Sequence, residues 1–379
     1  MLLALAYAAL LFAYRWGWCA KPEARFPEGF EPKSIVTVLI PARNEAENIE
    51  PCLKSILKGN YPRNLLEIIV IDDFSEDRTA EIVYQLSESL VSCIHLVDHL
   101  SAESQFTPNK KKAIEIGVSH AKGEIIVSTD ADCLVQKDWL LLIAAAFENP
   151  EIQMVCGPVA FHREKNVLQR FQSLDFLGLM GITGAGAQLG WHSMANGANL
   201  GFRKQAFETV NGYEGNAHLA SGDDMFLVQK VANHWPRCVL FLKSHGATVK
   251  TEAASDWRAF WHQRLRWGTK NATIPNWPLR LSLLTVFLFC WSIWVNLVLA
   301  LAYAALGIPA NFFWVFLFQI IIKAAFDYYF LSEMCRFFNR KDLLRSFLPS
   351  FFLHTAYIPL VGTASIFFKK YEWKGRITN

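Results

Sequence analysis

The sequence has few charged residues, and those it has are unevenly spread. Of its 379 residues, 19% are charged, 52% are hydrophobic and 14% are aromatic, and residues 281–322 contain no charge at all. This composition excludes an ordinary soluble two-domain protein. The net charge of +3, with Lys and Arg scattered, also argues against nucleic acid as the partner, because binding a phosphate backbone needs a clustered basic surface. We therefore expect a membrane protein with a soluble part.

Several common cofactor and metal motifs are absent. The sequence has no C-x-x-C pair, which argues against a zinc site or a dithiol redox site built on cysteine. It has no G-x-G-x-x-G and no P-loop, so nothing indicates a dinucleotide or phosphoryl transfer. We expect the cysteines to be reduced and buried in a domain that faces the cytoplasm. The eight are Cys19, Cys52, Cys93, Cys133, Cys156, Cys238, Cys290 and Cys335.

Two regions are apolar enough to cross a membrane. Residues 1–18 are apolar except for Arg15, and an uncleaved anchor is favoured over a signal peptide because no basic segment precedes them. The uncharged residues 281–322 are about twice the ~20 residues that one helical crossing needs. Two crossings are predicted there, at 281–306 and 312–331, joined by a turn at 307–311. Lys323 and Asp327 lie four residues apart in the second crossing; an internal ion pair is favoured over a lipid head-group or proton site.

A third apolar stretch, residues 347–368, is interrupted by Pro349, Pro359 and Gly362. A simple crossing there would put the basic residues of the tail outside the cell, against the positive-inside rule. We therefore predict a re-entrant or in-plane hairpin made of two short helices, followed by a cytoplasmic C-terminus.

Between the anchor and residue 281, strand-like runs alternate with helix-like runs, which is typical of an α/β fold with a largely parallel sheet. The predicted strands are 34–40, 66–71, 93–97 and 124–129, and the predicted helices are 45–57, 78–90 and 110–121. Each strand is followed by polar or acidic residues. Ligands of open α/β sheets bind outside the carboxyl ends of the strands, so these residues are candidates for a binding site.

Polar clusters follow the first two strands: Pro41-Ala42-Arg43-Asn44-Glu45, and Asp72-Asp73-Phe74-Ser75-Glu76-Asp77-Arg78-Thr79. Helix capping would account for Asn44 and for Asp77 or Ser75, but it does not account for acidic clusters at two neighbouring strand ends. These side chains are suited to accept hydrogen bonds from a base and a ribose.

Asp130 and Asp132 follow the fourth strand directly, and their spacing puts both carboxylates on the same side of an extended chain. Such a pair can hold a hard divalent cation whose other positions are filled by phosphate oxygens and water. The alternative is a pair of solvated turn aspartates.

Two more motifs lie further along the chain. Asp223 and Asp224 open a helix-like run, and one of two adjacent carboxylates is a plausible general base. Gln263-Arg264-Leu265-Arg266-Trp267 ends an aromatic, basic stretch just before the membrane. An interfacial amphipathic helix would also explain this stretch, and the two interpretations are compatible.

In this order, the motifs resemble those of the membrane-integrated inverting glycosyltransferases of family 2, whose nucleotide-sugar domain has the GT-A fold. The resemblance covers about residues 34–267. It rests on Pro-x-x-Asn-Glu, Asp-Asp-x-Ser-x-Asp-x-Thr, D-x-D, the acidic pair and Q-x-x-R-W. One departure is Asp223, where the family often has Glu, and this leaves open which of Asp223 and Asp224 is the base.

The resemblance implies transfer of a sugar from a nucleoside diphosphate sugar, a UDP-sugar being expected, to an acceptor hydroxyl with inversion. It assigns Asp132 and Asp130 to Mg²⁺ or Mn²⁺, Asp224 or Asp223 to the base, and Arg266 to the departing diphosphate. Donor-binding residues would be Pro41, Arg43, Glu45, Asp72, Asp73, Lys110, Asp130, Gln263 and Trp267. Single addition to a lipid-linked or saccharide acceptor is favoured; the alternatives are a processive polysaccharide synthase and an inactive nucleotide-sugar-binding anchor.

The expected organisation is an α/β GT-A domain between N- and C-terminal transmembrane helices, located in a bacterial inner membrane with the catalytic domain in the cytoplasm. The predicted parts are an anchor (1–19), a GT-A domain (32–250), interfacial helices (251–280), a transmembrane region (281–368) and a basic tail (369–379).

Overall fold

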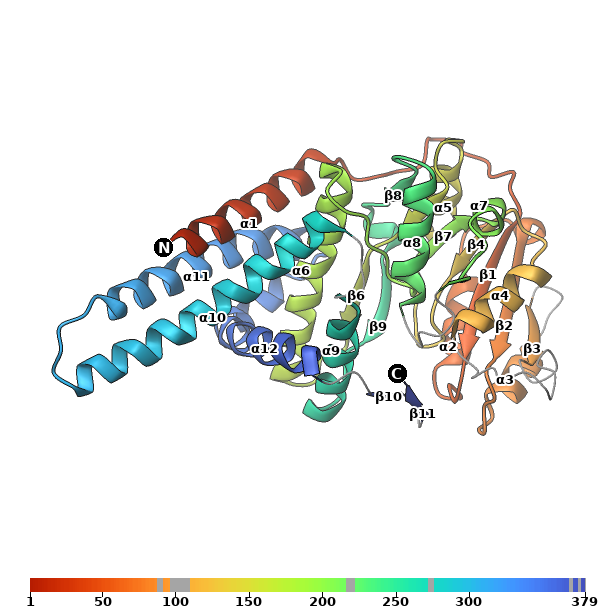
Figure 1. Ribbon diagram of the computed structural model, residues 1–379. Coiled ribbons are helices and arrows are strands. Elements are labelled where there is room, and N and C mark those ends of the chain that lie inside the picture. The colour runs from red at the N-terminus through yellow and green to blue at the C-terminus, as the bar shows by residue number, and fades with distance from the viewer. Residues whose placement is uncertain are drawn as a thin grey trace. The chain divides into compact units, whose positions relative to one another are not determined.

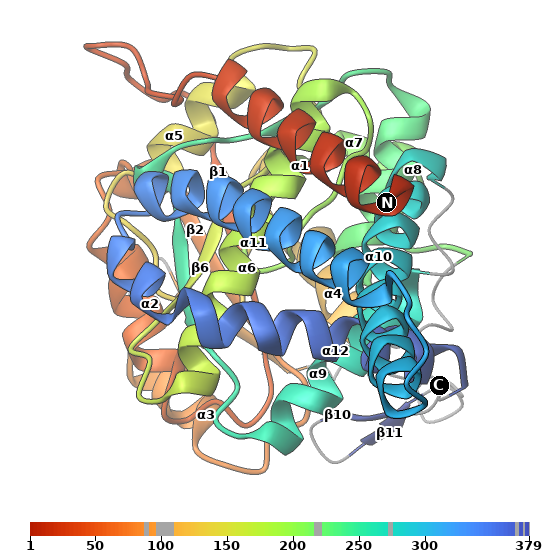
Figure 2. The same ribbon diagram turned by 90° about the vertical axis from the view of Figure 1, so that its left-hand side faces the viewer.

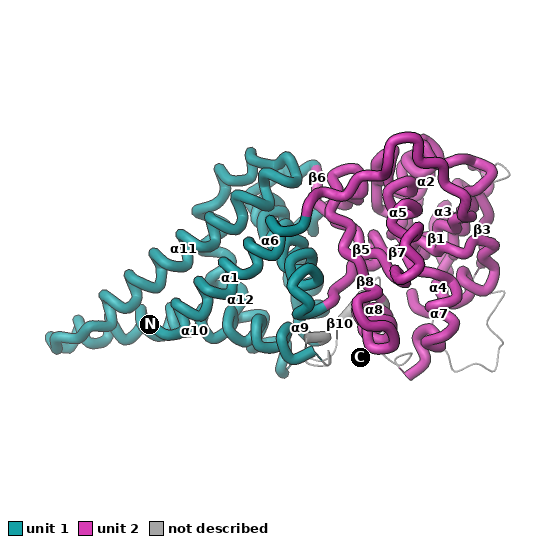
Figure 3. The backbone as a smooth tube through the Cα atoms, turned by 90° about the horizontal axis from the view of Figure 1, so that it is seen from above, with its two compact units in different colours: residues 1–21, 163–192, 253–379 teal, residues 22–162, 193–252 magenta. Residues whose placement is uncertain are grey.

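The computed structural model describes residues 1–86, 91–95, 110–215, 222–271, 276–367, 371–373 and 376–378. The chain forms two compact units (Figure 3). Unit 1 consists of Met1–Lys21, Arg163–His192 and Ala253–Asn379, and unit 2 consists of Pro22–His162 and Ser193–Glu252. Each unit is therefore assembled from segments that lie far apart in the sequence.

Unit 2 is built on a seven-stranded sheet with the order β3-β2-β1-β4-β7-β5-β8 (Figure 1). Neighbouring strands are parallel except that β7 is antiparallel to both β4 and β5. The strands are β1 (Val36–Ala42), β2 (Leu66–Asp72), β3 (Val91–His95), β4 (Ile125–Ser128), β5 (Met154–Cys156), β7 (Leu200–Arg203) and β8 (Val239–Phe241). A separate parallel pair joins β6 (Val159–His162) to β9 (Val249–Glu252). The predicted α/β fold with a mostly parallel sheet is confirmed.

The sheet is buried between helices, which is why the central strands β1 and β4 have no charged residues. Val38 and Leu39 on β1 are fully buried although they point to opposite faces. Gly117 lets α4 approach the sheet closely, since a Cβ at this position would lie 3.0 Å from side-chain atoms of Leu39 and Ile71. The helices of unit 2 are α2 (Ile49–Leu57), α3 (Thr79–Gln85), α4 (Lys110–His120), α5 (Trp139–Phe147), α7 (Lys204–Thr209) and α8 (Asp223–His234).

Predicted and observed elements differ mainly at their ends. The first helix of unit 2 begins at Ile49 rather than at residue 45, because the residues after β1 form hydrogen-bonded turns. Helix α3 is also shorter than predicted, ending at Gln85. The predicted helix end at 87–90 and strand end at 96–97 lie outside the described residues.

Unit 1 is helical. Its helices are α1 (Leu2–Ala20), α6 (Val167–Leu189), α9 (Trp257–Asn271), α10 (Trp277–Ala305), α11 (Phe312–Phe337) and α12 (Phe347–Phe367). Figures 1 and 2 show α1 lying alongside α11, and α10 forms a hairpin with α11. A short 3₁₀ helix, η4 (Lys341–Ser346), precedes α12, and β10 (Tyr371–Trp373) pairs with β11 (Arg376–Thr378).

Four helical segments of the described chain are long and apolar enough to cross a membrane. They are α1, α10, α11 and residues 341–367. The segments predicted as the anchor and as the two later crossings thus form helices of suitable length. The predicted ion pair inside α11 is present, with 2.6 Å between Lys323 Nζ and Asp327 Oδ2.

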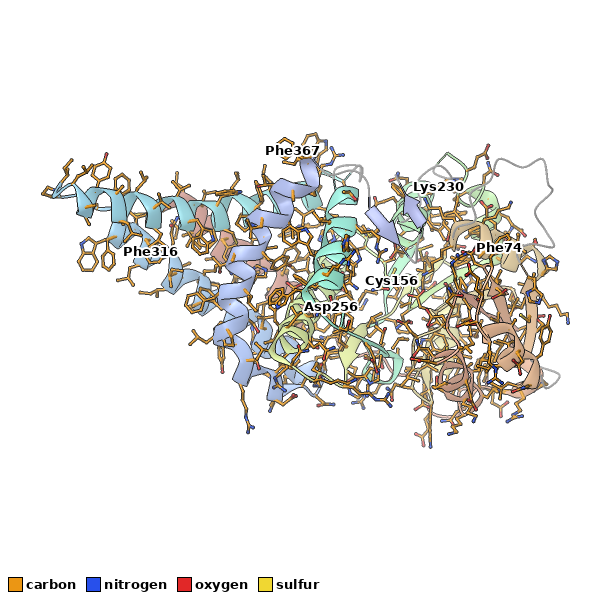
Figure 4. All side chains as sticks on the ribbon, turned by 90° about the horizontal axis from the view of Figure 1, so that it is seen from below. Phe74, Cys156, Lys230, Asp256, Phe316 and Phe367 are labelled. Atoms are coloured by element: carbon orange, nitrogen blue, oxygen red, sulfur yellow. The ribbon has the colours of Figure 1, made fainter. Side chains whose placement is uncertain are left out.

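The prediction that residues 347–368 form two short helices is wrong, because α12 is one continuous helix. Pro349 lies in its first turn, where a backbone N–H has no intrahelical partner to lose. Pro359 lies within the helix, and neighbouring helices can compensate for the hydrogen bond that it removes. Figure 4 shows α12, which ends at the labelled Phe367, running across α10 and α11 rather than alongside them.

All eight cysteines lie within the described residues and are free thiols. Six are buried, but Cys19 is exposed and Cys93 is half-buried, so the expectation that all would be buried is wrong for these two. Cys290 and Cys335 belong to helices of unit 1 rather than to the sheet domain.

Candidate active site

The loops after β1 and β2 are tied together by side chains. Asn44 accepts a hydrogen bond from the Glu76 backbone N–H at 2.8 Å, and its own N–H donates to Ser75 Oγ at 3.0 Å. Asn44 has a left-handed φ of 51°, which Asn tolerates better than most residues. Its side chain therefore links two loops and does not cap a helix; the N-cap residue of α2 is Asn48.

Asp77 and Thr79 extend this link. Asp77 Oδ2 accepts from the Ala46 N–H at 3.0 Å, and Asp77 Oδ1 accepts from the Thr79 N–H at 3.0 Å. The Glu45 N–H donates to Thr79 Oγ1 at 2.8 Å. These hydrogen bonds keep the pKa of Asp77 below its usual range despite partial desolvation. The two polar clusters found in the sequence are thus one structure at one edge of the sheet.

Two acidic residues end β2 and are buried. Asp72 and Asp73 are 6% and 4% exposed. Asp72 Oδ2 lies 3.2 Å from His95 Nδ1, whereas Asp72 Oδ1 is buried and has no hydrogen-bond partner among the described residues. Arg43 Nη1 donates to the Asp73 carbonyl at 3.0 Å, and Pro41 lies beside them on β1. A buried acceptor without a partner is suited to a donor group of a ligand.

The D-x-D motif follows β4 as predicted. Ligand atoms of Asp130, Asp132 and Cys133 all lie within 4.8 Å of one another. The Lys110 ammonium, from the first turn of α4, pairs with Asp130 Oδ1. Asp132 Oδ2 accepts a 3.1 Å hydrogen bond from Thr251 Oγ1 on β9. The motif is thus held by α4 and by β9, two elements that lie far apart in the sequence.

The electrostatics of this cluster fit a divalent cation. Asp132 is exposed, but desolvation by surrounding atoms, and then the nearby carboxylates of Asp130 and Glu45, raise its pKa to about 6. A cation held by both aspartates would relieve this repulsion, and carboxylate oxygens are the ligands that Mg²⁺ and Mn²⁺ prefer. Burial raises the pKa of the Cys133 thiol well above its usual value. Thiolate is also a soft ligand, which Mg²⁺ and Mn²⁺ do not favour.

Asp224 lies in the first turn of α8, just after Gly222, whose φ of 85° is left-handed. Its Oδ2 accepts a 3.1 Å hydrogen bond from the Gly197 N–H. The next carbonyl, that of Ala198, accepts a 2.9 Å hydrogen bond from Thr129, the residue before the D-x-D motif. The loop that contacts Asp224 is therefore anchored to the end of β4. Asp223 begins α8, and its side chain lies outside the described part of the chain.

The Q-x-x-R-W residues lie on α9, in unit 1. Gln263 Oε1 is buried and makes no hydrogen bond within the described ranges, and the Trp267 ring packs on Phe176 with 5.9 Å between centroids. Arg266 is partly exposed. A role of Gln263, Arg266 and Trp267 in the donor site stays a prediction.

Several residues near the site were not predicted from the sequence. Thr251 lies 119 residues after Asp132, and no local pattern marks it as a partner. The sequence marks Cys133 only as one of eight dispersed cysteines. His95 lies within the predicted strand 93–97; in the structure it ends β3 and pairs with Asp72, which ends β2.

Comparisons with known proteins identify the family of the chain. The family model described as glycosyl transferase family 2 matches residues 37–210, and the model described as glycosyl transferase family group 2 matches residues 125–328. Among relatives, the "probable glycosyltransferase YdaM" of Bacillus subtilis is 27% identical over 65% of this chain and 57% of its own length. A poly-beta-1,6-N-acetyl-D-glucosamine synthase of Staphylococcus aureus is 26% identical over 61% of this chain and 53% of its own. The chain thus spans little more than half the length of these two relatives.

A similar solved structure is the mannosyltransferase PcManGT from Pyrobaculum calidifontis in complex with GDP-Man and Mn²⁺. It is 21% identical, covers 97% of both chains and has a TM-score of 0.59. At this identity the likeness concerns the fold, which is the GT-A fold. The second family model covers more than half of the chain and includes β4, the D-x-D motif and Asp224. The chain therefore belongs to glycosyl transferase family group 2.

Proposed function

We propose that the protein transfers a sugar from a nucleoside diphosphate sugar to an acceptor hydroxyl at a membrane, with inversion at the anomeric carbon. The observation that carries this proposal is the Asp130–Asp132 pair at the end of β4, where desolvation, and then the nearby carboxylates of Asp130 and Glu45, raise the pKa of Asp132 to about 6. Such a pair is adapted to a divalent cation and, through it, to a diphosphate.

The donor would bind along the carboxyl edge of β1, β2 and β4. Asp72 and Asp73 would accept hydrogen bonds from the base and ribose, and Pro41, Arg43 and Glu45 would line the same edge. Asp72 Oδ1 supports this role, since it is buried with no hydrogen-bond partner in the described chain. Lys110, already beside Asp130, would approach the phosphates. A UDP-sugar is the expected donor.

Asp132 and Asp130 would hold Mg²⁺ or Mn²⁺, which would offset negative charge on the leaving diphosphate. Arg266 would contribute to the same stabilisation, with Gln263 and Trp267 beside it. Asp224 would accept the proton of the acceptor hydroxyl as its oxygen forms a bond to the anomeric carbon. The bond to the diphosphate breaks on the opposite face of the sugar, so the configuration inverts. Asp223 is the alternative base.

A lipid-linked acceptor and a single addition are favoured because the four described helical segments suited to a membrane are few for a channel that would carry a polymer across it. A processive polysaccharide synthase is the second candidate, and the similarity to a poly-beta-1,6-N-acetyl-D-glucosamine synthase supports it. An inactive nucleotide-sugar-binding anchor is disfavoured because Asp132, Asp224 and Arg266 are all present. The catalytic unit would face the cytoplasm of a bacterial cell.

The test is to incubate membranes containing the protein with UDP-glucose, UDP-N-acetylglucosamine and GDP-mannose, each labelled in the sugar. Label that enters organic solvent supports single addition to a lipid acceptor. Label retained in polymer would instead support the processive synthase. Nucleotide binding without release of nucleoside diphosphate from any donor would support the inactive anchor.

A further inference from the structure

A buried ion pair joins α6 to α9 within unit 1. Arg264 Nη2 lies 2.9 Å from Asp175 Oδ2, and the two side chains are 5% and 10% exposed. The guanidinium Nε and Nη2 have no aligned hydrogen-bond acceptor among the described residues, so charge holds the pair together. Removing one partner of a buried pair leaves the other as an uncompensated charge, which is costly.

The Arg264 guanidinium also lies over the Trp267 ring, 4.4 Å from its centroid. Phe176, the residue after Asp175, packs against the same indole at 5.9 Å. Arg264 and Trp267 are three residues apart, and residues so spaced are neighbours on a helix surface. Two consecutive residues of α6 thus hold two residues of the Q-x-x-R-W segment, one by charge and one by ring contact.

Helix α12 supports the same arrangement. The Tyr357 hydroxyl donates a 2.9 Å hydrogen bond to Asp175 Oδ1, and His354 Nε2 lies 3.9 Å from that oxygen. Gly268 lets α9 approach α12 closely, since a Cβ at this position would lie 3.0 Å from Ser365 Cβ. The motif helix is therefore fixed from two sides.

The polar contacts continue into the apolar helices. His354 Nδ1 lies 3.2 Å from Lys323 Nζ, which pairs with Asp327 at 2.6 Å. The Tyr7 hydroxyl of α1 donates to the other oxygen of Asp327. The ion pair inside α11 thus belongs to a series of polar contacts that runs from Arg264 through Asp175 and His354 to Tyr7.

We propose that Asp175 is a positioning residue for sugar transfer: through Arg264 it sets the orientation of α9, and so of Trp267 and Arg266. This inference rests on the proposed function. Apolar side chains alone could join α6 to α9 equally firmly. A charged pair whose guanidinium also stacks on Trp267 fixes the rotation of α9 about its axis as well as its distance from α6. Residues of α9 that must meet the donor need both to be fixed.

The first experiment compares Asp175→Asn with the wild type in native membranes, using whichever donor the labelled panel identifies. Misplacing a catalytic group by about 1 Å can cost about 10²-fold in rate, so kcat should fall by about that much. The metal requirement should stay within about twofold, because the D-x-D motif belongs to unit 2 and Asp175 does not. A second variant, Arg264→Lys, keeps the charge but loses the flat surface over Trp267, and should also lower kcat.

Glu164→Gln is the matched control. Glu164 belongs to the same unit and its side chain is 6% exposed; it makes two 2.9 Å contacts with Arg340 and accepts a hydrogen bond from Ser173, and neither partner is on α9. Its variant should retain kcat within about threefold, even if the protein becomes less heat-stable. If Asp175→Asn and Arg264→Lys lose no more kcat than Glu164→Gln, the positioning role is refuted.

A second experiment restores the position of α9 by other means. A Cβ at position 268 would lie 3.0 Å from Ser365 Cβ, about 0.5 Å closer than a disulfide needs, so cysteines at these two positions can bridge α9 and α12 after a small separation of the helices. In an Asp175→Asn background, oxidation should recover most of the lost kcat and reduction should remove it again. If the disulfide forms but kcat does not recover, the inference is contradicted. If the wild type transfers no sugar from any donor, the proposed function fails and this inference fails with it.

Discussion

Thr251 Oγ1 donates a hydrogen bond of 3.1 Å to Asp132 Oδ2, joining β9 to the D-x-D motif across 119 residues of sequence. This hydrogen bond lowers the pKa of Asp132, against the desolvation and the neighbouring carboxylates that raise it to about 6. It also fixes which way the carboxylate points. Asp132 is a proposed metal ligand, so Thr251 would act on the metal through it.

Thr251→Val should therefore weaken metal binding. Residues that orient a metal ligand typically contribute about 10- to 100-fold in affinity or activity. The measurement is the Mn²⁺ concentration that gives half-maximal sugar transfer, which should rise by an amount in that range. Thr248→Val is the control, because Thr248 is buried nearby but donates only to the Ser244 carbonyl. An unchanged half-saturation in Thr251→Val would show that Thr251 does not orient a ligand.

Local patterns were sufficient to predict the parts of the site that follow strands. β1 and β4 have uncharged, β-branched sequences because both their faces are buried, and the polar residues after them mark the carboxyl edge. Asp130, Asp132 and Asp73 were found in this way. Thr251 contacts Asp132 and His95 contacts Asp72. These contacts join distant segments, so no local pattern in the sequence indicates them.

Helix α6 shows the opposite case. Residues 167–189 include four glycines, which are poor helix formers, so the sequence gives a weak helix signal there. The glycines allow close packing instead: a Cβ at Gly181 would collide with Met334 of α11. Because these partners lie more than 150 residues away, the role of α6 in unit 1 could not be predicted from its own sequence.

The metal itself gives a direct prediction. Asp132→Ala should abolish transfer while the protein still inserts into membranes, since the substitution removes one of the two carboxylates at the end of β4. EDTA should abolish sugar transfer by the wild type until Mg²⁺ or Mn²⁺ is added back. Transfer assays with and without chelator test both points. Full activity in EDTA would show that transfer does not require a metal.

Arg266 gives a prediction about shape rather than charge. A guanidinium can contact two phosphate oxygens at once, whereas an ammonium acts as a point charge. Arg266→Lys should therefore transfer sugar poorly despite its charge, while Arg258→Lys, at an exposed position of the same helix, should not. Near-normal turnover in Arg266→Lys would favour a purely interfacial role for α9.

The orientation of α12 gives a prediction about topology. The helix is continuous, but it runs across α10 and α11 (Figure 4), as expected if it lies close to the membrane plane. The basic tail would then stay in the cytoplasm. A Thr378→Cys variant should resist a membrane-impermeant thiol reagent in intact cells and react after permeabilisation. The exposed Cys19 must first be replaced by Ser, so that it does not react itself. Labelling in intact cells would show that α12 crosses the membrane.

The most direct test of the account is the transfer of labelled sugar by the wild type and by Asp224→Asn in the same membranes. Removing a general base typically costs about 10²- to 10⁴-fold in rate. Asp224→Asn should lose transfer within that range while binding the donor almost as well as the wild type, and Asp223→Asn should remain active. If Asp223→Asn alone is inactive, Asp223 is the base. If neither substitution lowers transfer, or if the wild type transfers no sugar from any donor, the proposed mechanism is contradicted.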